Sequence, residues 1–332
     1  MIHLSRFLGA TRQRATLLLA GMLFAGVAAA ADPFPAKLVT MMVPYPAGGL
    51  SDVIARVVNT PLATRLGKPV VVENLGGASG AIGAQKVLGA PADGYYLFQG
   101  SPNELILSPL ANAAIKFKSE DFRLVQMIGV ANVVLLARKD LPASNIDELI
   151  ALARKNKNLT YGSVGVGSFY HLLGEDFSMK IDAPMVHVPY KGAAPVIQDL
   201  IGGQIDLFFA PFGKSHDELA AQGRIKVIGT LSNGRPEALK HLPGINEGKT
   251  LKDFTFTIWT GYFVRKETPE PVVARLHQAL TDTLNDPAVR KGLEANSLEV
   301  AQPLSLAEAA NVYRDGTAQF RAIAKSVNLT PQ

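Results

Sequence analysis

The 332-residue chain contains no cysteine. This absence excludes a disulfide framework, thiolate catalysis, an iron–sulfur cluster and any zinc site that needs a thiolate. The sequence also lacks a basic run after its first thirty residues. Those thirty hold three arginines and no acid, so the rest carries 33 − 3 = 30 basic and 28 acidic residues, a net charge of only +2. A nucleic-acid-binding protein needs a basic face, and we therefore expect no nucleic-acid partner.

Beyond residue 31 the sequence has no apolar run approaching the roughly 20 residues of a spanning helix. Residues 1–31 have the pattern of a signal peptide. Arg6, Arg12 and Arg14 precede an uncharged apolar run over 15–27, and four alanines follow at 28–31. The alternative is a membrane anchor, but the run is short and ends in alanines. We predict a periplasmic protein whose signal peptide is cleaved near Ala30 or Ala31.

The mature chain alternates short apolar runs with helical patterns, and 48% hydrophobic against 18% charged residues indicates a sizeable core. Helical spacing runs from Leu50 to Val57, with a break at Pro61 unless Thr60 caps a new turn. Ser144 and Asp147 suggest a capping box. Strand–helix alternation predicts an α/β fold with mainly parallel sheets. The predicted strands are Leu38–Val43, Val70–Val72, Tyr95–Phe98, Val133–Ala137, Met185–Val188, Ile205–Phe209 and Ile225–Thr230.

The length predicts at least two domains, at about 100–200 residues each, yet no Pro/Gly/Ser-rich linker divides the chain. We therefore expect the chain to cross between two lobes inside strands, at Asn132–Ala137 and Thr255–Val264. Lobe 1 would then contain residues 32–131 plus 256–332, and lobe 2 residues 132–255.

Three glycine-rich turns follow predicted strands and precede helices: 44–52, 73–83 and 161–168. Backbone N–H groups at such turns can approach an anion closely. Each turn also has a structural interpretation, such as an ordinary strand–helix turn or a helix capped by Ser168. The second turn spells Gly77-x-x-Gly80-x-x-Gly83, but it lacks the G-x-G start of a dinucleotide loop.

Support for catalysis is poor. Ser163 and Ser168 do not stand in a G-x-S-x-G elbow. His171 and Glu175 share a helix face and with one more ligand could bind a metal, but a single histidine of this kind is more often a packing residue. No H-E-x-x-H motif or EF-hand loop is present. We predict no catalytic residue, no metal and no cofactor, and the chain is not expected to be an enzyme.

The motifs, in order, resemble those of the Bug receptors, the extracytoplasmic solute-binding proteins of tripartite tricarboxylate transporters. The resemblance covers almost the whole mature chain. Its residues include Pro44-Tyr45-Pro46-Ala47-Gly48-Gly49 with Asp52, Val70-Val71-Val72-Glu73-Asn74, Gly80-Ala81-Ile82-Gly83, Pro91-Ala92-Asp93-Gly94-Tyr95, Tyr161-Gly162-Ser163, His187-Val188-Pro189-Tyr190-Lys191-Gly192, Gly202-Gly203-Gln204-Ile205-Asp206, Trp259, Gly261, Thr268-Pro269 and Asn285-Asp286-Pro287.

The resemblance implies a two-lobed periplasmic-binding-protein (Venus flytrap) fold with a ligand cleft between the lobes. It implies a monomer that captures a small carboxylate, either a di- or tricarboxylate or an aromatic acid, and delivers it to a membrane permease. Two alternatives remain: a ligand-dependent sensor for a membrane signalling protein, and an exported enzyme acting on a small anion. The implied binding residues are Tyr45, Ala47, Gly48, Gly49, Asp52, Ser79 and Gly80 on one wall, and Ser163, Gly167, Ser168, His171 and Asp206 on the other.

The chain departs from the family pattern at three places. One is Arg265-Lys266-Glu267, where members tend to have small residues before the Thr-Pro. Glu104 puts a carboxylate near the presumed cleft, where members often have Ser/Thr-rich residues. Ala210 stands where members frequently have an acid, and it follows Phe208 and Phe209. An α-amino acid needs a partner for its buried ammonium, so the loss of that acid favours a carboxylate without an amino group.

Overall fold

The computed structural model describes residues 34–232, 234, 236, 239–326 and 329–331, so the predicted signal peptide and its cleavage site lie outside the described residues. Lys37–Gln332 form one compact unit. Its strands are β1 (Val39–Val43), β2 (Val70–Asn74), β3 (Tyr96–Gly100), β4 (Phe122–Arg138), β5 (Thr160–Ser163), β6 (Val186–Pro189), β7 (Leu207–Pro211), β8 (Ile225–Thr230), β9 (Thr257–Arg265) and β10 (Leu298–Val300). Its helices are α2 (Leu50–Leu66), α3 (Ala81–Gly89), α4 (Ser108–Ala111), α5 (Ile146–Lys155), α6 (Phe169–Lys180), α7 (Ala193–Ile201), α8 (Lys214–Ala221), α9 (Glu270–Leu284), α10 (Pro287–Glu294) and α11 (Leu306–Ser326).

The strands follow the order β2-β1-β3-β9-β4-β7-β5-β6, and β8 and β10 pair with β4 beside this path. The seven strands predicted from the sequence are all present, each within about two residues at its ends except Val133–Ala137, which is the last part of the longer β4. β5 and β10 are short and were not predicted.

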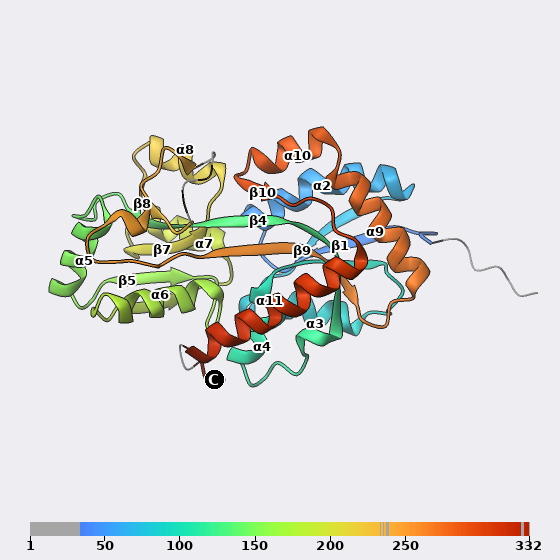
Figure 1. The fold of residues 1–332 in the computed structure, drawn as a ribbon, viewed down its shortest axis with the longest axis horizontal. Helices are drawn as coiled ribbons and strands as arrows, with labels where there is room; N and C mark the ends of the chain where they lie inside the picture. The colour runs from blue at the N-terminus through green and yellow to red at the C-terminus, as the bar shows by residue number, and fades with distance from the viewer. Residues whose placement is uncertain (1–33, 233, 235, 237–238, 327–328, 332) are drawn as a thin grey trace, which may run out of the picture. The chain divides into compact units, whose positions relative to one another are not determined.

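Two long strands join the two halves of this sheet system (Figure 1). The first part of β4, Phe122–Asn132, pairs with β9, while Val133–Ala137 pairs with β7 and also contacts β8. β9 pairs with β3 on its other edge. The expected crossing segments, Asn132–Ala137 and Thr255–Val264, therefore do lie largely in extended strands.

The expectation of mainly parallel sheets is wrong. β1 runs parallel to β2 and β3, and β5 runs parallel to β6 and β7. Every pairing of β4 and β9 is antiparallel. Strand–helix–strand units build the parallel edges, whereas β9 runs antiparallel to β3 and β4 runs antiparallel to β7, and the result is a mixed α/β fold.

Two local predictions about helix ends also need correction. α2 continues through Pro61 to Leu66 and ends at Gly67, which has φ +73°. The hydrogen bond that proline removes is outweighed by the buried face of this helix, which includes Val58 and Leu62. α5 is capped one residue later than predicted: the Asn145 side chain accepts from the Glu148 N–H at 3.0 Å.

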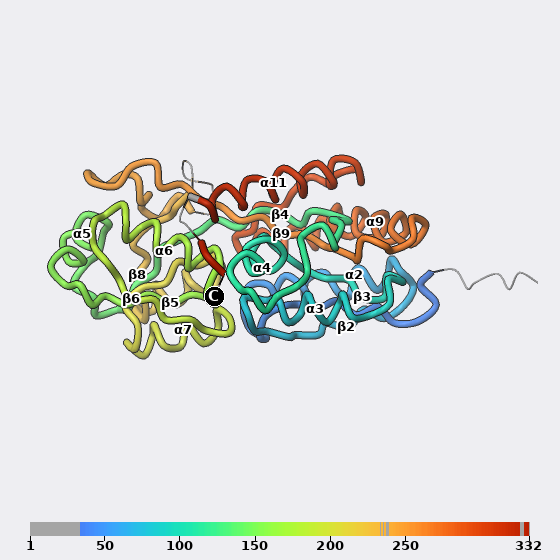
Figure 2. Tube along the Cα trace, turned by 90° about the horizontal axis from the view of Figure 1, so that it is seen from below, coloured from blue at the N-terminus to red at the C-terminus, as the bar shows by residue number. Residues whose placement is uncertain are grey.

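The core is continuous through both halves. Phe208 and Phe209 are fully buried on opposite faces of β7, where Phe208 contacts Tyr170 and Phe209 contacts Phe177. α11 lies against β4, as Figure 2 shows. Among the described residues, no helix combines the length and the apolar character needed to cross a membrane.

Candidate functional site

The first glycine-rich turn forms one wall of a cavity. It follows β1 and ends at Gly49, the N-cap of α2, which has no side chain to bond the exposed N–H groups of the first turn. Gly48 has φ +87°, a conformation that glycine adopts without strain. The Asn74 amide donates to the Tyr45 carbonyl oxygen at 3.1 Å and fixes the start of the turn. Backbone N–H groups are thus left free at the place where the chain enters α2.

Asp52 holds this turn in shape. Its Oδ2 accepts from the Gly48 N–H at 3.0 Å and from Arg56 Nε at 2.9 Å. Burial opposes ionisation of Asp52, but these hydrogen bonds outweigh it and lower the pKa of the carboxyl. Asp52 was among the predicted binding residues, and the structure places its carboxylate in the turn rather than among the residues lining the cavity.

The cavity has a volume of about 70 Å³. A single water needs about 10–15 Å³ on this scale, so the space suits a small organic molecule and is too small for a nucleotide. No charged residue is among those that line it. These are Tyr45, Pro46, Gly49, Leu50, Ser51, Ile54, Ser101, Asn103, Ala131, Ile258, Trp259, Thr260 and Leu298, together with Val164, Tyr170, Ala193 and Pro211 from the elements around β5 and β7.

The second and third glycine-rich turns touch each other beside this cavity. Ser79 Oγ donates to the Val166 carbonyl oxygen at 2.9 Å. Gly165 has φ +140°, and a Cβ there would lie 2.4 Å from Ser79 Oγ. At Gly167, a Cβ would lie 1.8 Å from the Ala111 Cβ. Glycine at 165 therefore lets the two turns approach, and glycine at 167 lets the third turn approach α4. Gly80 likewise gives room to Glu104, whose Cγ would lie 2.3 Å from a Cβ at that position.

The N-terminus of α6 is satisfied by protein groups. Ser168 is its N-cap and accepts from the His171 N–H at 3.3 Å. The Phe169 N–H donates to Asn103 Oδ1 at 2.6 Å. Ser168 therefore has the structural role that the sequence also allowed, and Asn103 adds a second contact between segments that are distant in the sequence.

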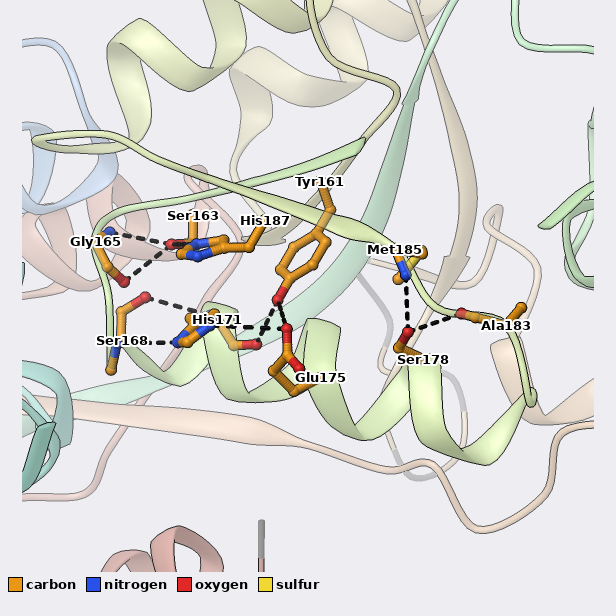
Figure 3. Close-up of polar contacts among 11 residues, drawn as sticks. Tyr161, Ser163, Gly165, Ser168, His171, Glu175, Ser178, Ala183, Met185 and His187 are labelled. Atoms are coloured by element: carbon orange, nitrogen blue, oxygen red, sulfur yellow. Dashed lines mark hydrogen bonds and ion pairs between the residues drawn. The ribbon is translucent and has the colours of Figure 1, made fainter. Parts of the chain in front are cut away.

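Beside the third turn lies a half-buried histidine pair (Figure 3). The rings of His171 and His187 stack with centroids 3.9 Å apart. His171 Nδ1 accepts from the Gly167 N–H at 3.0 Å, and His187 Nε2 shares a hydrogen bond of 2.7 Å with Ser163 Oγ. Burial lowers the pKa of His171, and burial together with His171 lowers that of His187 to about 3.

The two rings stabilise the third turn through their hydrogen bonds with Gly167 and Ser163, and they do not line the cavity. Glu175 accepts a hydrogen bond from the Tyr161 hydroxyl, which occupies one of its oxygens. Among the residues that the structure describes, no group of three or more His, Asp or Glu side chains is arranged to hold a metal ion.

Asp206 is not brought together with the other predicted residues. It precedes β7, next to the start of β5, and thus lies at the amino ends of these parallel strands. Its Oδ1 accepts from Arg138 Nε at 2.8 Å, and its Oδ2 accepts from the Thr160 N–H at 2.8 Å and from Thr160 Oγ1 at 3.1 Å. Asp206 therefore joins β4, β5 and β7 at the sheet end opposite the glycine-rich turns.

A buried carboxyl stands behind the cavity wall. Glu104 is 1% exposed and lies in the π-helical turn Asn103–Leu107. Its Oε2 accepts from the Ser101 N–H at 2.6 Å and from Ser101 Oγ at 2.8 Å. Burial raises the pKa of Glu104 to about 7. The Tyr45 hydroxyl is also buried, and burial, the Glu104 charge and a side-chain hydrogen bond with Glu104 raise its pKa well above the usual value.

Of the predicted residues, Tyr45 and Gly49 line the cavity. The others lie in or next to the contact between the second and third turns and stabilise it: Ser79, Gly80, Ser163, Gly167, Ser168 and His171. The cavity residues that sequence reasoning missed include Ser101, Asn103, Tyr170 and Trp259. The departure at 101–104 was the signal for Ser101 and Asn103, because polar residues there follow a strand directly, and Trp259 was among the residues that carry the family resemblance.

A cavity bounded by two sheet halves, which share two long strands, defines the chain as a periplasmic-binding-protein type of receptor. The structure of the periplasmic binding protein BugD is similar over 90% of this chain and 100% of BugD, with 29% identity and a TM-score of 0.83. MatC from Rhodopseudomonas palustris with bound malate has 25% identity and a TM-score of 0.80 over 87% of this chain and 99% of MatC. Rpa4515 of R. palustris with adipate has 27% identity and a TM-score of 0.81 over 90% of this chain and all of Rpa4515.

Residues 54–329 match the model of the tripartite tricarboxylate transporter family receptor. BugT of Bordetella pertussis is 32% identical over 287 residues, which are 84% of this chain and 86% of BugT. The chain therefore belongs to the tripartite tricarboxylate transporter receptor family, as a Bug-type solute-binding receptor.

Proposed function

We propose that this chain captures a small carboxylate in the cavity at the start of α2 and delivers it to a membrane permease, without chemical turnover. The observation that carries the proposal is that Gly49, Leu50 and Ser51 line a cavity without charged residues, at a helix N-terminus with no side-chain cap. Uncapped N–H groups and the helix dipole attract an anion there. Malate in MatC and adipate in Rpa4515 are carboxylates and support the same class of ligand.

In this proposal the carboxylate is held by neutral dipoles instead of a paired arginine. Tyr45 and Gly49 form the first contact wall. Ala47 and Gly48 belong to the same turn, and Ser79 and Gly80 support it from the second turn. Hydrogen bonds to a charged group contribute about 1.5–3 kcal/mol each, so several sustain a dissociation constant in the micromolar range after the costs of association.

The lobes in this proposal are residues 32–131 plus 256–332 and residues 132–255, and the ligand is enclosed by hinge closure. The contacts of Ser79 with Val166 and of Asn103 with Phe169 would then join the two lobes. Export to the periplasm, signal-peptide cleavage near Ala30 or Ala31 and a monomeric state belong to the same proposal. N-terminal sequencing of the protein from a periplasmic extract tests the cleavage site.

The decisive experiment is a thermal-shift screen over mono-, di- and tricarboxylates, followed by calorimetry of the positive acids. We expect at least one acid to raise Tm and to bind with 1:1 stoichiometry, and NMR to recover it unchanged after long incubation. A chemically altered acid would favour the enzyme alternative. The absence of binding by every acid would contradict the carboxylate assignment.

A further inference from the structure

A tyrosine on the α6 side of the cavity has a hydroxyl that no protein group satisfies. Tyr170 is the second residue of α6, lines the cavity and is only 4% exposed. Within the part of the chain that the structure describes, its hydroxyl forms no hydrogen bond, and only burial and the Glu104 charge raise its pKa. Buried polar groups are nearly always hydrogen-bonded, and an exception needs a reason. The cavity is the place where a partner for this hydroxyl can be supplied.

The neighbours of Tyr170 show which way its side chain extends. The ring packs edge-on against Phe208 of β7, with the two centroids 6.3 Å apart. The hydroxyl interacts electrostatically with Glu104 and Tyr45, which belong to the other half of the sheet system. The side chain therefore extends from α6 and β7 toward the first glycine-rich turn, and its hydroxyl end lies at the cavity.

The Tyr170 hydroxyl is a hydrogen-bond donor. Burial and the Glu104 charge raise its pKa above the usual value, so it keeps its proton at neutral pH. Two other hydroxyl groups of the lining residues already donate to protein acceptors. Ser101 Oγ donates to Glu104, and Thr260 Oγ1 donates to the Gly100 carbonyl oxygen at 3.0 Å. Tyr170 thus offers the cavity a neutral donor that the protein itself does not use.

We infer that Tyr170 is a ligand-binding residue, whose hydroxyl donates a hydrogen bond to an oxygen of the bound carboxylic acid. The inference rests on the proposed function, because the start of α2 must hold the acid in this cavity. α2 packs on β1 and β2, whereas α6 packs on β5 and β7. The acid therefore contacts both halves of the sheet system, through N–H groups of α2 and through the Tyr170 hydroxyl.

The test removes the hydroxyl alone. Tyr170→Phe is compared with the wild type and with Tyr262→Phe by calorimetry, using the acid that binds best in the carboxylate screen. Tyr262 is the matched control, because it is also fully buried with a hydroxyl that lacks a partner, but it does not line the cavity. Tyr170→Phe should weaken binding by about tenfold or more, since it loses a hydrogen bond to a charged ligand.

The control and the ligand-free proteins separate binding from a structural role. Tyr262→Phe should change affinity by less than about twofold, because no ligand contact is lost. Without ligand, both variants should keep Tm within about 2 °C of the wild type, since neither loses a protein hydrogen bond. Unchanged affinity in Tyr170→Phe, or an equal loss in both variants, overturns the inference and leaves the proposed function standing. If no acid binds the wild type, the proposed function and the inference both fail.

A crystal structure of the wild type with the bound acid gives a measurement that does not depend on a variant. Tyr170 Oη should lie within about 3.0 Å of a ligand oxygen. A separation beyond about 3.5 Å overturns the inference. This distance decides the question if Tyr170→Phe lowers the ligand-free Tm and its loss of affinity can no longer be assigned to the hydrogen bond.

Discussion

Replacing Asp206 with alanine separates a structural role from a ligand-binding role. The carboxylate accepts three hydrogen bonds, from Arg138 Nε, the Thr160 N–H and Thr160 Oγ1, at the amino ends of β5 and β7. We expect Asp206→Ala to lower stability and to leave carboxylate affinity unchanged, because none of these groups lines the cavity.

The expected loss of stability in Asp206→Ala follows from how exposed the Arg138–Asp206 ion pair is to solvent. Breaking a buried ion pair by removing one partner costs about 3–5 kcal/mol, but the Arg138 and Asp206 side chains are 27% and 17% exposed. Because water partly replaces the lost contacts at this exposure, we expect Asp206→Ala to lower the free energy of unfolding by about 2–3 kcal/mol. At about 2–4 °C per kcal/mol for a domain of a few hundred residues, Tm should fall by about 4–12 °C.

The assay pairs thermal unfolding with calorimetry of the acid that binds best in the carboxylate screen. Asp217→Ala serves as the control, because Asp217 pairs with His241 at the surface and should change Tm by less than about 2 °C. A tenfold loss of affinity in Asp206→Ala with an unchanged Tm would refute the structural assignment and return Asp206 to the ligand site.

Three further predictions concern the neighbouring turns and helices. Ser168→Ala should cost about 1 kcal/mol of unfolding free energy through the lost α6 cap, measured by urea denaturation, and a loss much below 0.5 kcal/mol would contradict the capping role. Gly165→Ala should destabilise the fold by about 1–3 kcal/mol, because residue 165 has a positive φ and a Cβ there would contact Ser79. An unchanged Tm together with an unmoved turn in a crystal structure of the variant would contradict the steric argument. Burial lowers the pKa of His216 to about 4, so the unfolded chain binds its proton first as pH falls below about 6.5. Stability should therefore fall by about 1–2 kcal/mol more between pH 7 and 5 in the wild type than in His216→Gln, and equal pH slopes would refute this.

Local patterns in the sequence were enough to predict the elements. Apolar runs bounded by turn residues placed seven of the strands. For largely buried strands such as β1 and β7 the physical reason is that a strand covered on both faces must be apolar throughout. The lack of a linker predicted that the chain would cross between two halves inside strands. The two expected segments lie largely in β4 and β9, and β4 pairs with strands of both halves. The glycine-rich turns were recognisable because glycine is required where φ is positive or where backbones approach closely, as at Gly48 and Gly165.

Which side chains meet was decided by the tertiary structure alone. Asp206 looked like a cleft residue, yet its place before β7 puts it at the amino ends of the strands beside Arg138. Trp259 and Tyr170 lie 89 positions apart in the chain and line one cavity. The contact of the buried Tyr45 hydroxyl with Glu104 follows from packing, because the two residues lie 59 positions apart in the chain. Sequence spacing determines the face of an element on which a residue lies, whereas contacts between distant elements depend on how those elements pack.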